Sequence, residues 1–301
     1  MAEFEEVNVV NLRLLPIMKI FCLFIFILNT ISCKTTNIPA ITNISSAPES
    51  KTAEGGIEYE KIVLKREDGS VQYAHVVKVS DLKSNSFVVR SYEDFQKEGA
   101  VTPSSYAKSN SLKVSMNASF FDANYTPIGP TFSRNTEWET HIKPIYRSTG
   151  VFSCNIDNKC SLDYYDEFTK NNFNADKHYN AVTGFPIILR NGKTPSLTSD
   201  DRHPRSVVGL DKSRNLYFIV TDGRSFDALG GFKRVIGFSY KEMSRLLLGL
   251  GVTDALNLDG GGSSNIILNG NRVNLRKATN PVKKPDEVLQ ERKVPVLIGI
   301  K

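Results

Sequence analysis

From Ile57 onward the chain consists mainly of short segments in which apolar and polar residues alternate, separated by polar turns. Alternation with a period of two is typical of β-strands, because successive side chains on a strand point to opposite faces. The pattern predicts strands over these segments: Val71–Val79, Ser86–Arg90, Lys113–Met116, Ala181–Arg190, Ser206–Leu210, Leu216–Thr221, Ala255–Leu258, Asn265–Leu268, Arg272–Leu275 and Val294–Ile300. Asn191-Gly192 and Asn269-Gly270 have the sequence of tight hairpin turns.

Helices are predicted in only two places. One is a short helix within Glu93–Lys108. The other begins at Ser239, which forms a capping box with Glu242 and precedes an apolar segment that runs to about Leu248.

The order of these elements predicts the fold class. Residues 122–176 are rich in Asn, Thr, Tyr and Pro, which predicts long loops and hairpins. Many strands without a regular alternation of strand and helix favour an α+β fold over a Rossmann fold. We therefore expect residues 55–301 to form a single domain, built on a mixed, largely antiparallel sheet with a few helices.

The first 33 residues have the pattern of a secretory signal peptide. Lys19 precedes nine apolar residues, Ile20–Leu28. Crossing a bilayer takes about 20 residues, whereas this length matches the apolar centre of a signal peptide. Met18 is the predicted start, because acidic residues follow Met1 where such signals carry positive charge. A buried helix is the alternative interpretation.

Ser32 and Cys33 resemble the end of a bacterial lipobox, in which the cysteine is acylated and becomes the mature N-terminus. Thr30 stands where that motif usually has Leu, so export without a lipid is the alternative. With Cys33 acylated, residues 34–54 form a flexible tether to the membrane. The protein is then exported and held in the cell envelope or periplasm.

The composition is that of a folded protein with a core: 40% of the 301 residues are hydrophobic, and 17 Phe and 11 Tyr are present. This aromatic content excludes a disordered chain. The net charge of +6 is spread along the sequence without long runs of Lys and Arg, so nucleic acid is not an expected partner.

Cys154 and Cys160 are the two cysteines outside the signal peptide, which contains Cys22 and Cys33. They flank a polar loop between two short apolar stretches, so a hairpin brings both sulfurs within bridging reach. In an exported protein, a disulfide is favoured over two free thiols. Zinc is not expected, because the four histidines lack pairwise metal spacing: His75, His141, His178 and His203.

Three predicted strands end directly in a polar residue that is followed by small residues. Asp222 follows one of them, Asp259 a second and Asn117 a third. A rigid strand followed by a permissive turn fixes a polar side chain while a ligand approaches the backbone. Asp254, near the end of the predicted helix, is expected to be structural.

The loop after Asp259 predicts an anion-binding site. It contains Gly260, Gly261 and Gly262, whose successive N–H groups can surround an anion, and Ser263 and Ser264 add hydroxyl donors. A phosphate or a sugar suits such a loop, and a tight hairpin without a ligand is the alternative. The loop is not a P-loop, because the Lys of that motif is absent.

Two arginines are candidates for binding phosphate. A guanidinium presents paired donors to phosphate oxygens, and both Arg205 and Arg224 lie at predicted strand ends. Solvated surface charges are the alternative. Phe120 and Phe121 are expected in the core, with stacking on a sugar ring as the alternative.

Together these motifs resemble the phosphodiester glycosidase domain family over residues 55–300. Four motifs carry the resemblance: Asn117-Ala-Ser-Phe-Phe121, Arg205-Ser-Val-Val-Gly209, Thr221-Asp-Gly-Arg224 and Asn257-Leu-Asp-Gly-Gly-Gly-Ser-Ser264. One residue departs from the family pattern. Ser119 stands where the first motif usually has a second glycine, which can crowd the loop around Asn117.

The resemblance implies hydrolysis of the bond between a sugar's anomeric carbon and a phosphodiester oxygen. Asp259 is the first candidate for the catalytic carboxylate and Asp222 the second, and the substrate is a sugar phosphate or glycan. Arg205, Arg224 and the glycine loop then neutralise the phosphate. No cofactor is required by this chemistry; a divalent cation such as Ca²⁺, held by Asp and Asn oxygens, is compatible with it, although the sequence has no calcium-loop signature.

Two other functions are compatible with the same residues. One is a catalytically silent surface lipoprotein that binds glycans and keeps the loop for recognition. The other is a phosphodiesterase that cuts the P–O bond instead of the C–O bond.

Overall fold

The computed structural model describes residues 51–139, 141–170, 178–196, 199–227, 233–274 and 291–301. These residues form nineteen strands in three sheets and four α-helices. The strands pair antiparallel, apart from one parallel contact in the largest sheet. This confirms the predicted α+β fold. The predicted signal peptide, the start at Met18, the acylated Cys33 and residues 34–50 of the predicted tether lie outside the described residues.

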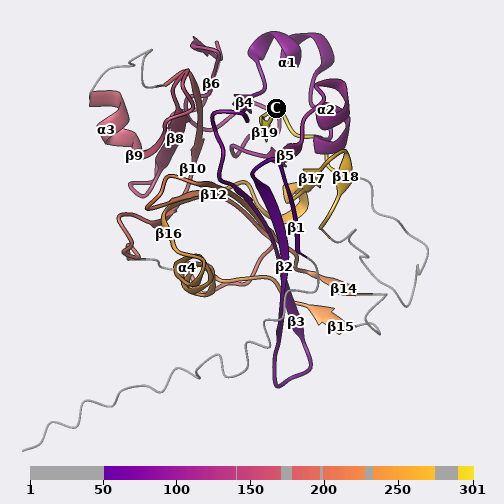
Figure 1. The fold of residues 1–301 in the computed structure, drawn as a ribbon. Coiled ribbons are helices and arrows are strands. Elements are labelled where there is room, and N and C mark those ends of the chain that lie inside the picture. The colour runs from indigo at the N-terminus through magenta and orange to yellow at the C-terminus, as the bar shows by residue number, and fades with distance from the viewer. Residues whose placement is uncertain (1–50, 140, 171–177, 197–198, 228–232, 275–290) are drawn as a thin grey trace, which may run out of the picture. The chain divides into compact units, whose positions relative to one another are not determined.

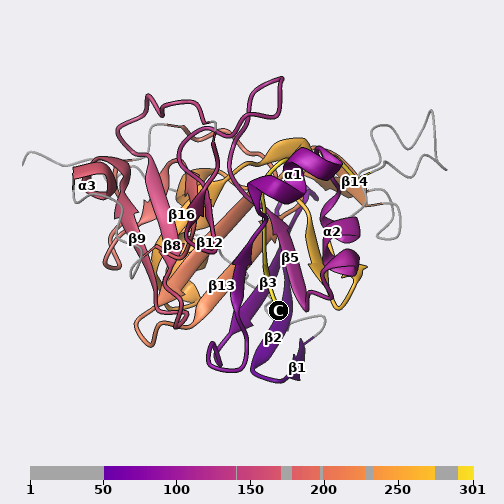
Figure 2. The same ribbon diagram turned by 90° about the horizontal axis from the view of Figure 1, so that it is seen from above.

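The largest sheet has nine strands, and its central strands lie side by side in Figure 2. Its main path follows this order: β1 (Lys51–Glu54), β2 (Ile57–Lys65), β3 (Val71–Val79), β13 (Leu216–Thr221), β12 (Arg205–Asp211), β16 (Val252–Leu258) and β11 (Ile187–Leu189). The remaining two strands are β15 (Lys233–Val235), which pairs parallel with β3, and β14 (Ser225–Asp227), which pairs with β15. Residues 51–54, which the sequence analysis assigns to the flexible tether, instead form β1 and pair with β2.

Two smaller sheets have five strands each. The first follows the order β7 (Thr136–Glu137), β6 (Phe132–Ser133), β10 (Asn180–Gly184), β8 (Gly150–Cys154) and β9 (Cys160–Tyr164). The second follows the order β18 (Asn271–Arg272), β17 (Ile266–Leu268), β5 (Val114–Asn117), β19 (Leu297–Ile300) and β4 (Phe87–Val89). β17 and β18 form the predicted hairpin around Asn269-Gly270.

The core lies on both faces of the large sheet. One face packs against both small sheets, where buried Phe218 and Leu256 join Phe87 and Phe152 in one cluster. Helix α4 (Tyr240–Gly249) covers the other face with apolar side chains such as Met243, and Figure 1 shows it opposite the small sheets. The other helices are α1 (Tyr92–Glu98), α2 (Pro103–Ser109) and α3 (Tyr165–Lys170). No helix in the described part of the chain is long and apolar enough to cross a membrane.

The predicted capping box of α4 is confirmed. The Glu242 N–H donates to Ser239 Oγ at 3.2 Å, and the Ser239 N–H donates back to Glu242 Oε2 at 3.0 Å. The helix expected within residues 93–108 is instead two helices. Gly99 ends α1 with a φ of 66°, and Thr102 caps α2.

The prediction of one strand over Ala181–Arg190 is wrong. The segment divides at Pro186 into β10 and β11, which belong to different sheets. Proline has no N–H to continue a ladder, so β10 of the first small sheet ends before it, and the chain continues as β11 in the large sheet. Helix α3 also lies in a region that the sequence predicts as loops and hairpins.

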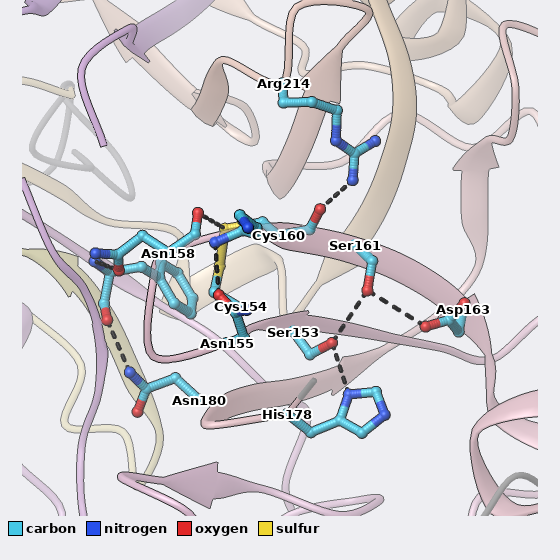
Figure 3. The surroundings of a disulfide bond; sticks show 12 residues. Ser153, Cys154, Asn155, Asn158, Cys160, Ser161, Asp163, His178, Asn180 and Arg214 are labelled. Carbon is cyan, nitrogen blue, oxygen red and sulfur yellow. Dashed lines mark hydrogen bonds between the residues drawn. A yellow bond between two sulfur atoms is a disulfide. The ribbon is translucent and has the colours of Figure 1, made fainter. Parts of the chain in front are cut away.

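The predicted disulfide between Cys154 and Cys160 is confirmed (Figure 3). The two residues are direct partners in the hairpin of β8 and β9. Asn158 in the turn between them has a φ of 58° and accepts a hydrogen bond at 3.0 Å from the Phe87 N–H. Arg214 donates to the Cys160 carbonyl. The cross-linked hairpin is thereby attached to both other sheets.

Replacing both cysteines, Cys154→Ala with Cys160→Ala, is expected to lower the free energy of unfolding by about 2 kcal/mol. The reason is that the bond closes a short loop and its loss restores entropy to the unfolded chain. Urea unfolding followed by circular dichroism measures the difference. Dithiothreitol is expected to lower the stability of the native protein to that of the double variant and to leave the variant unchanged. Equal stability of oxidised protein and variant contradicts the prediction.

Candidate functional site

The site lies at the edge of the large sheet where β12 begins. β12 pairs antiparallel with β13 on one side and with β16 on the other. Arg205 is therefore opposite Thr221, and Ser206 is opposite Leu258. Because Asp222 and Asp259 directly follow those two strands, the pairing brings both acids and Arg205 to one edge.

Asn117 joins three segments at this edge. Its side chain is fully buried, and its Nδ2 donates to the Asp259 carbonyl at 2.6 Å. Its Oδ1 accepts from Ser206 Oγ at 2.8 Å and from the Asn265 N–H at 3.1 Å. The Asp259 N–H donates to the Ala118 carbonyl at 2.9 Å. The backbone of Asp259 is thus held on both sides, while its side chain is half-buried.

Ser119, the departure from the family pattern, contributes to this packing. Its Oγ accepts from the Thr183 N–H of β10 at 3.2 Å, and the residue is 2% exposed. The hydroxyl therefore binds the first small sheet instead of entering the loop around Asn117.

Three glycines pack against the backbone of His203 and Pro204. A Cβ on Gly260 lies 2.6 Å from the Pro204 carbonyl oxygen, and a Cβ on Gly237 lies 2.6 Å from the His203 carbonyl. A Cβ on Gly223 meets Gly237 at 2.7 Å. No side chain fits at these distances, so the loops after β13, β15 and β16 meet directly at the start of β12.

Positive charge gathers at the same place. Arg205 is 6% exposed; its Nε donates to the Phe238 carbonyl at 3.2 Å, and its Cζ lies 3.9 Å from the centre of the Tyr240 ring. Arg224 is exposed, has a φ of 53° and contacts the ring of His203 through Nη2. The structure thus brings both predicted arginines and a histidine together.

Burial and neighbouring positive charges lower the pKa values of two of these basic side chains, Arg205 and His203. Burial lowers the pKa of Arg205 below its usual range, and the charge of Arg224 adds to this effect. Burial also lowers the pKa of His203, with further contributions from Arg224 and Arg205. A protein that holds like charges this close gains from an anion bound among them.

The glycine loop uses part of its donors internally. The Gly261 N–H donates to the Pro204 carbonyl at 3.0 Å, and the Ser263 N–H donates to the Gly260 carbonyl at 3.1 Å. Ser264 Oγ is buried and has no hydrogen-bond partner among the described residues. The Gly260 and Gly262 amides and this hydroxyl therefore remain the donor candidates for a ligand.

Arg292, which the sequence analysis does not single out, borders the loop. Its Nη1 donates to Ser263 Oγ at 3.3 Å, and its Cζ lies 5.5 Å from the centre of the Phe121 ring. A third guanidinium thus lies against the serine end of the loop.

Asp222 is buried, unlike Asp259. It is 3% exposed, and its Oδ2 lies 2.8 Å from His75 Nε2. His75 Nδ1 in turn lies 3.0 Å from the Tyr59 hydroxyl, and Asn274 Nδ2 donates to Asp222 Oδ1 at 3.4 Å. Burial, together with the charge of Asp222, raises the pKa of Tyr59 to about 12.

Aromatic rings follow the segment that binds the backbone of Asp259. Phe120, two residues after Ala118, stacks on Phe185 with ring centres 4.2 Å apart, and the ring centre of Tyr146 lies 4.5 Å from that of Phe185. Tyr146 is 51% exposed. Asn257 Nδ2, two residues before Asp259, donates to the Phe185 carbonyl at 2.8 Å. Asp259 is therefore hydrogen-bonded to the segment that carries Phe120, while the following Gly260 packs against Pro204, next to Arg205.

Asp254 is structural, as expected. Its Oδ1 lies 3.2 Å from Arg190 Nη1, and it accepts from the Asn191 N–H at 3.1 Å. In the described ranges of the chain, no group of three or more His, Cys, Asp and Glu side chains is arranged to hold a metal ion.

The sequence motifs match a known protein family. The family model of the phosphodiester glycosidases matches residues 110–301, which is more than half of the chain. The chain belongs to the phosphodiester glycosidase family. All four motifs of this family member lie at the edge described above, from Asn117 in the first motif to Ser264 in the last. No curated protein sequence matches the chain.

Two solved structures share the fold of this phosphodiester glycosidase family member. One is the catalytic domain of zebrafish N-acetylglucosamine-1-phosphodiester α-N-acetylglucosaminidase, auto-inhibited by pro-peptide. It has a TM-score of 0.62 and 19% identity, over 84% of this chain and 86% of that chain. The other is a hypothetical protein from Synechocystis, with a TM-score of 0.53 and 15% identity, over 81% of this chain and 62% of that chain.

The sequence analysis of this family member missed the partners of its motif residues. His75 carried a signal, because it is a polar residue in the middle of an apolar strand. Asn274 and Tyr59 carried none, since only the pairing of distant strands brings them to Asp222. His203 was considered as a metal ligand and not as a neighbour of Arg224.

Gly260→Ala is expected to lower the free energy of unfolding by about 1–3 kcal/mol, because the new Cβ overlaps the Pro204 carbonyl oxygen. Gly262→Ala is the matched control. Its Cβ meets only the Arg292 side chain, at 3.6 Å, so a change within about 0.5 kcal/mol is expected. Urea unfolding of both variants measures the difference. Equal destabilisation by the two substitutions contradicts the close approach of the loops.

Proposed function

We propose that the protein is an exported hydrolase that cleaves the bond between a sugar's anomeric carbon and a phosphodiester oxygen. The products are a free sugar and a phosphomonoester. The observation that supports this most strongly is that the loop of Asp259 contacts both kinds of ligand-binding residue. Gly260 packs against Pro204, next to Arg205, which suits a phosphodiester, and Asp259 is hydrogen-bonded to Ala118, two residues before the Phe120 ring, which suits a sugar face.

In the proposed reaction, water attacks the anomeric carbon and gives a proton to Asp259. The C–O bond to phosphate breaks, and its electron pair stays on the phosphate oxygen. A phosphate ester is a weak base, so its departure needs little protonation but does need neutralisation of charge. Arg205, Arg224 and the amides of Gly260 and Gly262 are the proposed source of that neutralisation.

Asp222 is the proposed second acid, and its burial suggests a role different from that of Asp259. Two carboxylates in different surroundings commonly take different parts in glycoside hydrolysis. Asp259, on the half-buried loop, is the acid that reaches the water. Asp222 supports the oxocarbenium-like charge from beneath, within the array of His75 and Asn274.

We also propose that the protein acts outside the cytoplasm, in the cell envelope or periplasm, and that Cys33 carries the lipid. The disulfide between Cys154 and Cys160 supports an oxidising compartment. Mass spectrometry of the mature N-terminus tests the anchor, and an acylated Cys33 is the expected result.

Asp259→Asn is expected to fold normally and to lose turnover on a sugar 1-phosphodiester by about 10²- to 10⁴-fold, because the water loses its base. Release of free sugar from a soluble diester measures the rate. Asp254→Asn, on strand β16 before the loop, is the matched control and is expected to keep its turnover. Retention of most activity by Asp259→Asn removes Asp259 from the mechanism.

The same assay separates the alternative functions. In water enriched in oxygen-18, cleavage of the C–O bond labels the sugar, whereas cleavage of the P–O bond labels the phosphate. A wild-type protein that binds glycans but releases no sugar from any diester is a glycan-binding protein.

A bound phosphodiester is expected to raise the pKa of His203. In the unliganded protein this pKa is lowered by burial and by two guanidinium groups, so folding favours neutral His203. Stability contributed by His203 is therefore present above its unfolded pKa of about 6.5 and is lost as pH falls. An anion among the cations opposes this shift. Titration of the His203 ring by NMR, with and without dimethyl phosphate, measures it, and His141 serves as the control. An unchanged pKa contradicts anion binding at the cluster.

A further inference from the structure

Buried polar side chains next to the site form a continuous hydrogen-bond network, called the polar network below. Tyr59 on β2 contacts His75 on β3 at 3.0 Å, and His75 contacts Asp222 at 2.8 Å. Asn274, which follows β18, contacts Asp222 at 3.4 Å and donates to the Ser264 carbonyl at 3.1 Å. The polar network therefore links β2 of the large sheet to the end of the glycine loop.

A contribution to stability alone is a weak explanation for the presence of this polar network. His75 is 1% exposed and Asp222 3% exposed, so both ionisable groups have left water. Taking a charge out of water costs several kcal/mol, and well-packed apolar residues of similar volume are often as stable as a buried ion pair. The polar groups instead fix side-chain orientations, because each hydrogen bond restrains the next side chain.

The directions of the hydrogen bonds are consistent from one end to the other. An ionised Asp222 accepts, so His75 donates through Nε2–H, and a neutral ring then has its lone pair on Nδ1. The Tyr59 hydroxyl donates to that nitrogen, and with a pKa raised to about 12 it keeps its proton. One tautomer of His75 is thereby selected.

At its other end, the polar network is hydrogen-bonded to the glycine loop through Asn274. Asn274 Oδ1 accepts from the Ile266 N–H at 3.0 Å, while its Nδ2 donates both to Asp222 and to the Ser264 carbonyl. Both ends of the Asn274 amide are therefore occupied, and Asp222 is one of the groups that orient it. If the Asp222 side chain turns away, Asn274 loses this contact and Ser264 is held less firmly.

We propose that His75 is a positioning residue of the site: it orients Asp222, and Asp222 in turn helps to position the Ser263–Ser264 end of the glycine loop through Asn274. The inference rests on the proposed function, since it assigns the loop to phosphate. Asp222 contacts His75 from β3 and Asn274; Tyr59 from β2 contacts His75, and Arg272 on β18 contacts Asn274 at 3.4 Å.

Two substitutions of His75 separate positioning from packing. His75→Gln retains a side-chain N–H long enough to reach Asp222, whereas the shorter His75→Asn does not reach it. We expect His75→Asn to lower kcat/KM at least 10-fold, because Asp222 has lost the donor that orients it. His75→Gln is expected to stay within about threefold of wild type.

His178→Asn is the matched control. His178 is 2% exposed and contacts Ser153 Oγ at 2.9 Å in the cross-linked sheet (Figure 3). Its substitution is expected to lower stability without changing kcat/KM. Should His75→Asn fail to fold, Tyr59→Phe carries the test, and a smaller loss of kcat/KM is expected. A wild-type kcat/KM in both His75→Asn and Tyr59→Phe overturns the inference.

Binding of inorganic phosphate, measured by calorimetry, tests the effect on the loop without turnover. His75→Asn is expected to bind phosphate about 10-fold more weakly than wild type, and His178→Asn equally well. A wild-type protein that turns over substrate, with equal phosphate affinity in both variants, overturns the inference alone. A wild-type protein that neither hydrolyses a diester nor binds phosphate overturns the proposed function, and the inference falls with it.

Discussion

The antiparallel pairing of β12 with both of its neighbours is the constraint on which the site depends. It places the start of β12 beside the ends of β13 and β16, so residues that are distant in sequence meet at one sheet edge. The register matters as much as the pairing. A slip by one residue turns every side chain to the other face, and Ser206 then loses its contact with Asn117.

Backbone contacts make this edge compact. Gly223, Gly237 and Gly260 come from three loops. Gly237 packs against His203, Gly260 against Pro204 and Gly223 against Gly237, each at a distance that excludes a Cβ. Glycine loses more conformational freedom on folding than other residues, so each of these positions lowers stability unless the contact requires it. Here the glycines allow the loops that contain Asp222, Arg224 and Asp259 to pack closely at one sheet edge.

Local patterns predicted most elements, because strand alternation, hairpin turns and the capping box of α4 are encoded within a few neighbouring residues. The disulfide between Cys154 and Cys160 was predictable for the same reason, since both cysteines lie in one hairpin. Partners across sheets were not predictable. His75 meets Asp222 only because β3 pairs with β13, and no local pattern specifies that pairing. The division of residues 181–190 between two sheets depends on tertiary packing in the same way.

The two acids of the site differ in what surrounds them, and this difference bears on how a phosphate leaving group is handled. Asp259 has its backbone fixed by Asn117 and Ala118 while its side chain is half-buried, so it is held in place and still reaches solvent. Asp222 is enclosed by hydrogen-bonding groups. Asp222 is thus hydrogen-bonded to groups of the protein, whereas the guanidinium groups of Arg205 and Arg224 lie near one another. The positive charge of these two guanidinium groups favours an anion from outside at this edge.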